Sequence, residues 1–413
     1  MLAPATDPTV GEGARGVARA RPLRLLMVLE SDFTPQGGGG AESQVRTLAL
    51  HLLRIGQQVA VVTPLLARGP QVTAQRCEGI PVGRIRYPRL PIVGAAVMCL
   101  RFGVFLFGHG RRYDAWHVHI GHHLGAVTCL VGALVGKPVV VKISGSWELE
   151  QGAMAPFKGL GGPKLFACLA RRWLKRAGAV QAISTRLAAE LTRQGFPAER
   201  ILVLPNAVDT ARFRGRAAPR VPGAPFTAVF VGRLVPEKEL GTLLEAWAAA
   251  FLAGDAARLR LVGGGPLEGP LRAQAARLGL SRQVEFLGHR DRVEEVLADA
   301  DVGVLPSRIE GLSNTLLEYM ASELPALASR VSGSEDFVVP GRNGWLFDVG
   351  DVTALAAALR EAQSLPPERL AVMGRQARAD VEATASLDIV AGKLLSLYAG
   401  AHPRDLRDVR EKP

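Results

Sequence analysis

Two glutamates eight positions apart, Glu310 and Glu318, lie in the segment SRIEGLSNTLLEYMA, residues 307–321. Glu310 follows a short apolar run that is typical of a buried strand, and Gly311 after it permits a tight turn into a helix. The first N–H groups of a helix lack internal partners and carry its positive dipole end, which favours a diphosphate. Glu318, two helical turns further on, can then face the same ligand. The segment predicts an anion-binding site; a capping glutamate beside an exposed helical glutamate is the plainer alternative.

A pair of cations, Arg233 and Lys238, follows the apolar run FTAVFV in the second half of the chain. Because ligands bind at the carboxyl edge of open parallel sheets, cations placed there can hold a diphosphate. They can also neutralise the charge that builds on a leaving nucleoside diphosphate. Taken alone, an arginine and a lysine in a loop more often belong to a solvated surface.

Two glycine-rich turns follow other apolar runs, QGGGGAE at residues 36–42 and LVGGGP at residues 261–266. Glycines let backbone N–H groups approach a phosphate or a sugar closely. The first turn is not a Walker loop, because no Gly-Lys-Ser/Thr follows it. It also departs from the GxGxxG dinucleotide fingerprint, because the next strand ends without an acidic residue. Contact with a ligand and a simple turn of the chain both remain open for these segments.

Short apolar runs alternate with segments of helical periodicity along the chain, as in right-handed βαβ units around parallel sheets. The predicted strands lie at residues 23–30, 58–64, 115–120, 138–144, 179–184 and 201–206 and, after a break, at 226–233, 258–265, 284–288, 301–307 and 324–329. The break, RGRAAPRVPGAP, has the composition of a linker. The predicted fold class is α/β, with two Rossmann-like parallel-sheet domains facing each other across a cleft.

The predicted boundaries follow from this alternation and from the composition of the ends. They are a disordered leader over 1–22, a first domain over 23–210, a linker over 211–225, a second domain over 226–375, a C-terminal helix over 376–400 and a flexible tail over 401–413.

The composition narrows the class of protein. With 413 residues, of which 48% are hydrophobic and 21% charged, the chain is neither largely disordered nor a disulfide scaffold. Its four cysteines form no Cys-x-x-Cys pair, so no zinc ribbon or thioredoxin-type site is predicted. The most apolar stretch, residues 91–110, is interrupted by Arg101 and falls short of the ~20 apolar residues that a membrane-spanning helix needs. The expected location is the cytoplasm.

The excess of positive over negative charge lies entirely in the first half of the chain. Residues 1–210 hold 25 Lys and Arg against 12 Asp and Glu, whereas residues 211–413 hold 25 against 26. Two stretches, 84–112 with six arginines and 170–178 with Trp173, mix basic and apolar residues. They predict a peripheral contact with the anionic inner face of a membrane, and ordinary helices with solvated arginines are the alternative. No nucleic-acid-binding motif is present, so nucleic acid is not an expected partner.

The motifs, taken in order, resemble one family. They are GGGGAE (37–42), NAVD (206–209), VGRLVPEK (231–238), LVGGGP (261–266), LPSRIEGLSNTLLEYMA (305–321) and GRNGWLF (341–347). This ordered set is similar to that of the retaining glycosyltransferases of family 4, which have the GT-B fold. The resemblance covers about residues 23–400 and is strongest over 226–360. It implies transfer of a sugar from a nucleotide-sugar donor in the second domain to an acceptor on the first.

The resemblance also implies roles for individual residues. Arg233 and Lys238 would hold the diphosphate, and Glu318 would bind the ribose hydroxyls. Glu310 would contact the donor sugar near the reacting carbon. The remaining implied donor-binding positions flank the cleft: Gly39, Gly40, Gly311, Leu312, Ser313 and Asn314. A C-terminal helix would cross back to the first domain.

The chain departs from the family at one functional position. Many relatives have a histidine after the strand that matches PVVVKIS, whereas this chain has Ser144-Gly145-Ser146. Either Ser144 or Ser146 takes over its role, or the role is absent.

Two groups of residues have side chains that can bind a metal ion, but neither group predicts a metal site. The histidines of WHVHIGHH (116–123) are frequent in such enzymes without a metal, and His119 is instead a candidate for the acceptor pocket. Asp299 and Asp301 mimic an Asp-x-Asp metal motif, but they lie where a helix ends and a strand begins. Neither a metal nor another cofactor is expected.

The expected function is sugar transfer from a UDP- or GDP-sugar to a hydroxyl of a glycan or lipid-linked acceptor, as in the assembly of bacterial surface polysaccharide, lipopolysaccharide or glycolipid. Two alternatives stay open. One is a nucleotide-sugar epimerase of the same fold, which acts on the donor alone. The other is a catalytically degenerate subunit that binds or acts as a scaffold.

Overall fold

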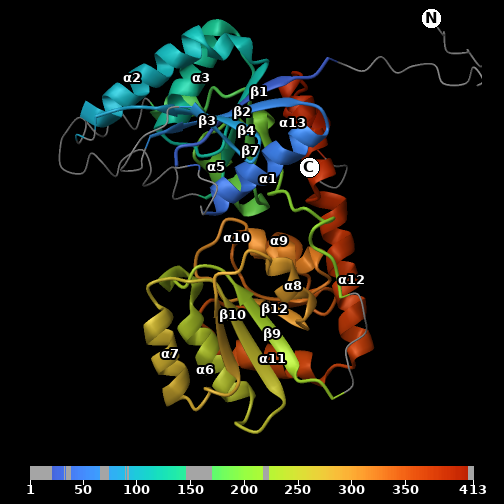
Figure 1. Cartoon of the computed structure of the whole chain (residues 1–413). Coiled ribbons are helices and arrows are strands. Elements are labelled where there is room, and N and C mark those ends of the chain that lie inside the picture. The colour runs from blue at the N-terminus through green and yellow to red at the C-terminus, as the bar shows by residue number, and fades with distance from the viewer. Residues whose placement is uncertain are drawn as a thin grey trace, which may run out of the picture.

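The structure, a computed structural model, describes residues 21–31, 33, 39–65, 74–88, 90, 93–145, 170–216 and 223–407. Most of the predicted leader, part of the predicted linker and the end of the predicted tail lie outside these residues. The described chain forms two α/β domains, one above the other in Figure 1, each built around its own parallel sheet. The predicted two-domain architecture is confirmed.

In the first domain, the described strands form a sheet in the order β3-β4-β2-β1-β5-β6-β7-β8. Their bounds are β1 Arg24–Val28, β2 Gln58–Pro64, β3 Ala74–Cys77, β4 Ile80–Ile85, β5 Ala115–Val118, β6 Val139–Ile143, β7 Ala179–Ala182 and β8 Ile201–Val203. All pairings are parallel except that of β3 with β4. The central strands are buried along nearly their whole length, which explains their continuous apolar runs.

Helices cover both faces of this sheet. The bounds of the longer ones are α1 Gly40–Arg54, α2 Val93–Gly108, α3 His123–Val135, α5 Thr185–Arg193 and α13 Leu387–Tyr398. The pair α2 and α3 packs on one face, where Phe102 and Leu106 meet Trp116. The pair α1 and α13 covers the opposite face, so a C-terminal helix completes the core of the N-terminal domain.

The second domain has a parallel sheet in the order β11-β10-β9-β12-β13-β14. Its strands are β9 Phe226–Val231, β10 Ala257–Val262, β11 Val284–Gly288, β12 Val302–Leu305, β13 Ala326–Ser329 and β14 Gly344–Phe347. Its helices are α6 Leu240–Ala250, α7 Glu268–Arg277, α8 Val293–Ala298, α9 Asn314–Ala321, α10 Ser332–Phe337, α11 Val352–Ser364 and α12 Pro367–Thr384. The helices that carry the contacts between the domains, α1, α5, α9 and α10, each come after a strand in chain order.

The C-terminal helix differs from the prediction of one segment over 376–400. Helix α12 stays with the second domain, where it packs on α9, and the chain crosses at Ala385 and Ser386 to begin α13. The crossing is held by backbone hydrogen bonds: Val208 N–H donates to Ala385 O and Leu387 N–H donates to Val208 O. Beyond α13, part of the predicted tail forms the 3-10 helix η6 (Pro403–Leu406), and the Arg407 guanidinium after it donates to Ile201 O at 3.0 Å.

The two domains touch directly across the space between their sheets. The side chain and backbone N–H of Thr185 at the start of α5 both donate to the Asp336 carboxylate of α10. Beside them, Arg186 forms an ion pair with Glu335.

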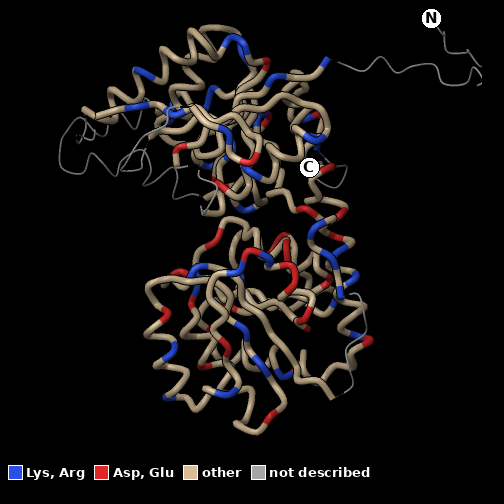
Figure 2. Tube along the Cα trace, viewed as in Figure 1, with Lys and Arg blue, Asp and Glu red and all other residues tan. Residues whose placement is uncertain are grey.

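The acidic residues are concentrated in the lower domain of Figure 2, as the division of charge along the chain predicts. Among the described residues, no helix is long and apolar enough to cross a membrane.

Candidate active site

The loop that carries Arg233 rests on the second glycine-rich turn. Gly232 N–H donates to Val262 O, and Leu234 N–H donates to Gly264 O, both at 2.9 Å. At Gly263, with φ +122°, a Cβ atom would lie 2.0 Å from the carbonyl oxygen of Gly232. The LVGGGP turn is therefore glycine-rich because it packs against the arginine loop. The Arg233 side chain is exposed and has no hydrogen bond or ion pair within the described residues.

Lys238 and Glu310 meet in an ion pair. Lys238 ends the 3-10 helix η5 (Pro236–Lys238), and its Nζ lies 3.0 and 2.9 Å from the two carboxylate oxygens of Glu310. Arg308 joins the two loops, because its N–H donates to Glu237 O at 2.9 Å and its guanidinium pairs with Glu239. The side chains of the pair are only 14% and 18% exposed. The structure thus brings together a cation and a carboxylate that are 72 positions apart in the sequence.

Helix α9 begins directly after this ion pair. Its N-cap residue, Ser313, makes no side-chain capping bond, so the side chain leaves the first N–H groups of the helix uncovered. Leu312 and Ser313 are buried, so their side chains offer little surface to a ligand. Tyr319 anchors the helix to the sheet, since its hydroxyl accepts a bond from Val231 N–H at 2.8 Å. Helix α9 therefore presents its positive end beside Lys238 and Glu310.

The first glycine-rich turn approaches the same helix from the other domain. Helix α1 begins at Gly40 with Gly39 as its N-cap, again without a side-chain capping bond. The side chain of Asn314, the first residue of α9, donates to Gly40 O at 3.1 Å. Two helix N-termini of opposite domains thus converge with Lys238 near them, an arrangement suited to a diphosphate. Gly37 and Gly38 lie outside the described residues.

The segment Ser144-Gly145, which stands where the family resemblance implies a histidine, lies against Gly311. A Cβ atom at position 311 would be 1.9 Å from the carbonyl oxygen of Ser144, so only glycine permits this contact. Ser144 reaches the site with its backbone, and Ser146 lies outside the described residues. The contact explains the glycine after Glu310 better than the tight turn alone.

Glu318 lies in a different environment from Glu310. It is on α9 near Arg212 and Glu294, which form an ion pair with each other at 2.8 Å. Burial raises the pKa of the Glu318 carboxyl to about 7; the nearby Arg212 lowers it and Glu294 raises it further. A carboxyl group with this pKa changes its charge near neutral pH. It does not line the cavity on which Glu310 borders.

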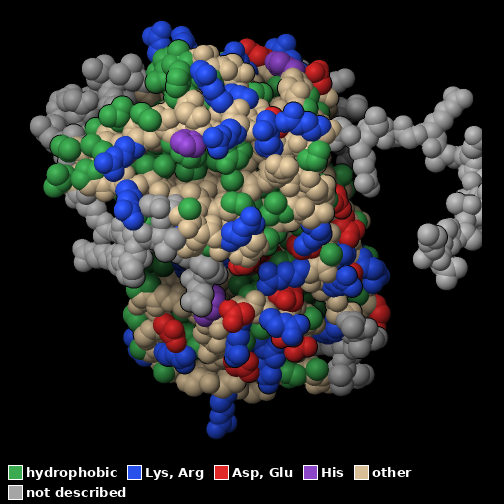
Figure 3. Space-filling view, turned by 45° about the horizontal axis from the view of Figure 1, so that its top comes forward, with side chains coloured by type: hydrophobic (Ala, Val, Ile, Leu, Met, Phe, Trp, Pro, Cys, Tyr) green, Lys and Arg blue, Asp and Glu red, His purple; other side chains and the backbone are tan. Residues whose placement is uncertain are grey.

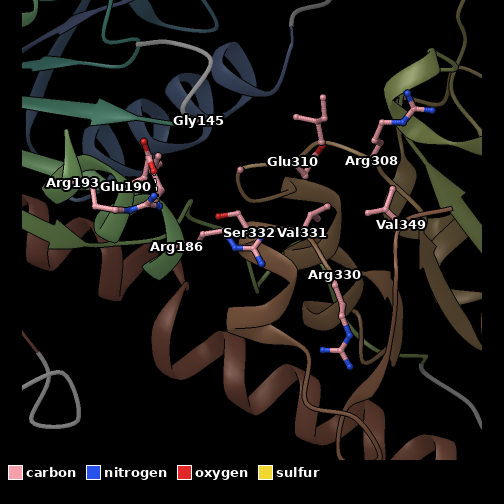
Figure 4. A pocket seen from close by; sticks show the side chains of 13 residues that line it. Gly145, Arg186, Glu190, Arg193, Arg308, Glu310, Arg330, Val331, Ser332 and Val349 are labelled. Carbon is pink, nitrogen blue, oxygen red and sulfur yellow. Dashed lines mark ion pairs between the residues drawn. The ribbon is translucent and has the colours of Figure 1, made fainter. Parts of the chain in front are cut away.

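A cavity of about 390 Å³ lies between the domains (Figure 4). One wall is formed by α5, with Arg186, Glu190 and Arg193, and by Gly145. The other wall comes from the second domain and includes Glu310, Gly311, Val331, Ser332 and Val349. Figure 4 shows Arg308 and Arg330 directed away from each other at the edges of this wall. The cavity extends from Glu310 to the first domain, where an acceptor is expected.

The predicted place of His119 in the acceptor pocket is wrong. His119 is 2% exposed and lies in the core with His117, their ring centroids 4.0 Å apart. Burial lowers the pKa of His119 well below its usual value, so the ring is neutral. The cause is α13, whose Tyr398 hydroxyl lies 2.6 Å from His117 Nδ1 and closes this face of the sheet. The adjoining cavity, lined also by Lys142, has a volume of about 10 Å³.

Each of the two groups with metal-type ligands has members that are bound by other protein groups. His123 Nδ1 lies 2.9 Å from the Glu30 carboxylate, and the carboxylate of Asp301 accepts a bond from Thr227 N–H at 2.8 Å. Within the described residues, no group of three or more His, Cys, Asp or Glu side chains is arranged to hold a metal ion.

Two family models match the chain, one in each domain. "Glycosyl transferase 4-like domain" matches residues 39–207, and "Glycosyl transferases group 1" matches residues 225–364. The second match contains Arg233, Lys238, Glu310 and Glu318, and the first contains Gly39 and Gly40.

Curated relatives agree with these models. The putative colanic acid biosynthesis glycosyltransferase WcaL of Escherichia coli K12 is 32% identical over 231 residues, which are 54% of this chain and 57% of that protein. The chain therefore matches little more than half of this relative's length. A GDP-mannose-dependent alpha-mannosyltransferase of Mycobacterium tuberculosis is 28% identical over 92% of this chain and 98% of its own.

Solved structures share the fold at low sequence identity. Anabaena HepE in complex with UDP has a TM-score of 0.71 and 18% identity, covering 92% of this chain and all of that one. Sucrose-phosphate synthase of Thermosynechococcus elongatus has a TM-score of 0.73 and 20% identity, covering 91% and 98%. With both domains matched by family models and the whole fold shared, the chain belongs to the group 1 glycosyltransferases of the GT-B fold.

Proposed function

We propose that this protein transfers a sugar from a UDP- or GDP-sugar to a hydroxyl group of a glycan or lipid-linked acceptor, with retention of anomeric configuration. The observation that carries the proposal is the meeting of the Lys238–Glu310 pair with the N-termini of α9 and α1. Cations and helix N-termini suit the diphosphate of a donor. The Anabaena neighbour binds UDP and two mycobacterial relatives are named for GDP-mannose, which supports these two donor classes.

The chemistry that suits this site is a front-face displacement. The bond between the anomeric carbon and the diphosphate oxygen breaks, and its electron pair stays on the diphosphate. The acceptor oxygen forms its bond to the same face of that carbon, and its proton passes to the departing diphosphate oxygen. Arg233, Lys238 and the start of α9 stabilise the charge on the diphosphate, so the protein acts by position and electrostatics. Since these groups supply the positive charge, activity is expected to persist in EDTA.

The donor class can be identified by thermal unfolding in the presence of UDP, GDP, ADP, CMP or dTDP, without added metal. A ligand at a hundred times its dissociation constant stabilises the folded state by ~2.7 kcal/mol, so the donor nucleotide should raise the unfolding temperature of the wild type. The Arg233→Ala/Lys238→Ala variant should show no such shift. Equal stabilisation of both proteins would contradict the assignment of these cations to the diphosphate.

The products of the reaction distinguish the proposed transferase from the two alternatives that the sequence left open, an epimerase and a scaffold subunit. An epimerase would convert the bound nucleotide-sugar into its epimer and would need no acceptor. A transferase would release the nucleoside diphosphate and a glycosylated acceptor. A scaffold subunit would bind nucleotide weakly or not at all and release neither. Chromatography of the reaction products with and without a lipid-linked glycan acceptor therefore tests the proposed reaction.

The surface of the first domain supports a membrane-bound acceptor. Helix α2 buries Met98, Phe102 and Leu106 against the sheet. Its outer face is also apolar, with Leu100, Val104 and Phe107 exposed by 68%, 66% and 53%. A helix that is apolar on both faces has a second partner besides its own core. Figure 3 shows hydrophobic side chains among basic ones on this flank of the domain.

The charged residues around α2 favour an anionic partner for its apolar outer face. Arg101 and Arg112 are exposed, and the Arg111 guanidinium lies 4.5 Å from the centre of the Phe107 ring. The chain has no Asp or Glu between Glu78 and Asp114. An apolar stripe in a stretch that has arginines and no acidic residue is suited to the interface of an anionic bilayer, where each basic residue contributes ~1 kcal/mol. We infer that α2 rests on the inner face of the membrane that holds the acceptor.

Vesicle flotation tests this contact. The wild type should float with phosphatidylglycerol-containing vesicles and much less with phosphatidylcholine alone. Leu100→Gln/Val104→Gln/Phe107→Gln should lower the bound fraction at least tenfold, because each exposed side chain buries its apolar surface in the bilayer. Leu252→Gln, at a side chain 77% exposed in the other domain, is the matched control and should not alter binding. Unchanged binding of the triple variant would overturn the assignment of α2.

A further inference from the structure

Three consecutive residues after β8 bind three different elements of the molecule. The side chain of Asn206 binds the start of α9. The backbone of Ala207 exchanges two hydrogen bonds of 2.9 Å with the side chain of Gln44 in α1. The backbone of Val208 binds the crossing segment before α13. These residues therefore join both helices of the candidate diphosphate site to the point where the chain crosses between the domains.

The Asn206 side chain fixes the orientation of a second amide. It is 7% exposed, and its Nδ2 donates to Asn314 Oδ1 at 2.7 Å and to Leu312 O at 3.3 Å. With its oxygen bound in this way, the Asn314 amide directs its own Nδ2 to Gly40 O at 3.1 Å. A relay of two amides thus runs from Asn206 through α9 to the first residue of α1.

We propose that Asn206 is a positioning residue, which sets the start of α9 against the Gly39–Gly40 turn so that both helix N-termini address one donor diphosphate. This inference rests on the proposed function, because the two helix N-termini need to be aligned only if they bind a donor diphosphate together. Asn206 itself acts through Asn314 and not on the donor. An amide is required there: the carboxylate of an aspartate would face the oxygens of both Asn314 and Leu312 without a proton to donate.

The first experiment needs no substrate. Hydrogen exchange of the ligand-free protein should be faster in Asn206→Ala than in wild type over residues 312–322 and 39–48, by roughly fivefold or more, because the two hydrogen bonds of the Asn206 amide are lost. Gln181→Ala is the matched control. Gln181 is also a buried amide, and it holds the same segment through Leu204 O at 2.9 Å and Pro205 O at 3.3 Å, with no hydrogen bond to α9 in the part of the chain that the structure describes. Equal exchange of the two variants at α9 would overturn the proposal.

The second experiment measures the reaction itself with the nucleotide-sugar that the wild type uses. Asn206→Ala should lower kcat/KM for the donor about tenfold and raise the share of donor hydrolysed by water, because misaligned domains exclude water poorly. Gln181→Ala, with a comparable loss of thermal stability, should keep the ratio of transfer to hydrolysis.

A double-mutant cycle shows whether Asn206 acts through Asn314. In an Asn314→Ala background, Asn206→Ala should change kcat/KM less than twofold, because its partner is already absent. Fully additive losses, or an Asn206→Ala enzyme with unchanged kinetics, would overturn the relay. If the wild type transferred no sugar at all, the proposed function would fail, and the exchange experiment would still decide the role of Asn206.

Discussion

Replacing Lys238 with alanine is expected to lower the turnover of sugar transfer at least tenfold, which corresponds to ~1.4 kcal/mol in the activation barrier. Lys238 is mostly buried, and its ammonium is held at 2.9 Å from Glu310. In the proposed mechanism, removing it takes a cation away from the leaving diphosphate. The change also leaves the Glu310 carboxylate unneutralised beside that diphosphate, so two effects act in the same direction. Steady-state kinetics with saturating donor and acceptor measures the loss.

Further variants separate the two effects. Lys238→Arg keeps the charge and should retain more activity than Lys238→Ala. Lys238→Ala/Glu310→Gln removes the repulsion between the Glu310 carboxylate and the diphosphate, but it does not restore the lost cation. This double variant should therefore bind nucleoside diphosphate better than Lys238→Ala alone. Arg272→Ala is a control for nonspecific loss of charge, since Arg272 forms an exposed ion pair with Glu268 on α7. Full turnover in Lys238→Ala would remove this residue from the site.

The fold was accessible from the sequence because parallel strands buried on both faces leave continuous apolar runs. The charged residues after these runs were equally visible, and Arg233, Lys238 and Glu310 all follow such strands. Their mutual geometry was not. Beside the Lys238–Glu310 pair, Arg308 joins its own loop to the turn before α6 through Glu237 and Glu239. Contacts between loops so far apart in the chain leave no periodic signal.

Packing of the C-terminal helix explains the wrong prediction for His119. A histidine at the end of a strand faces the ligand edge in the absence of other information. Here α13 returns to the first domain and covers that face, bringing Tyr398 to His117 across 281 positions. The resemblance implied a helix that crosses back, but the predicted bounds of 376–400 span two helices, and the side chains that α13 buries were not predicted. Asn206 was overlooked for a related reason, because its partners Leu312 and Asn314 belong to the other domain.

Glu318 is expected to make nucleotide binding depend on pH. In the ligand-free protein its pKa is raised to about 7, so near pH 6 most molecules carry the protonated form. Ribose hydroxyls that donate to this carboxyl stabilise the carboxylate and lower its pKa in the complex. Binding at pH 6 should therefore release a proton. The affinity should rise with pH up to about 7 and level off above it, with a difference of tenfold or more between pH 5.5 and 7.5.

Calorimetry in buffers of different ionisation enthalpy counts the protons released. Because the terminal phosphate of a free nucleotide also titrates, the decisive quantity is the difference between wild type and Glu318→Gln, which should be close to one proton at pH 6. Glu318→Ala should mainly weaken donor binding and leave turnover at saturation less affected. If Glu318→Gln released as many protons as wild type, the carboxyl would not contact the ribose.

The same group has a second, independent effect on stability. Its pKa in the folded protein lies above the usual glutamate value of 4.5, so between these two values the folded state binds more protons than the unfolded state. The contribution of Glu318 to the free energy of unfolding must therefore fall as pH rises from about 4.5 to 7, and bound nucleotide should reduce this fall. Denaturant unfolding of wild type and Glu318→Gln at both ends of this range measures it. A carboxyl group that costs stability at neutral pH, yet lies one turn along the helix whose start meets Lys238 and Gly40, is expected to serve a ligand that uses its charged form.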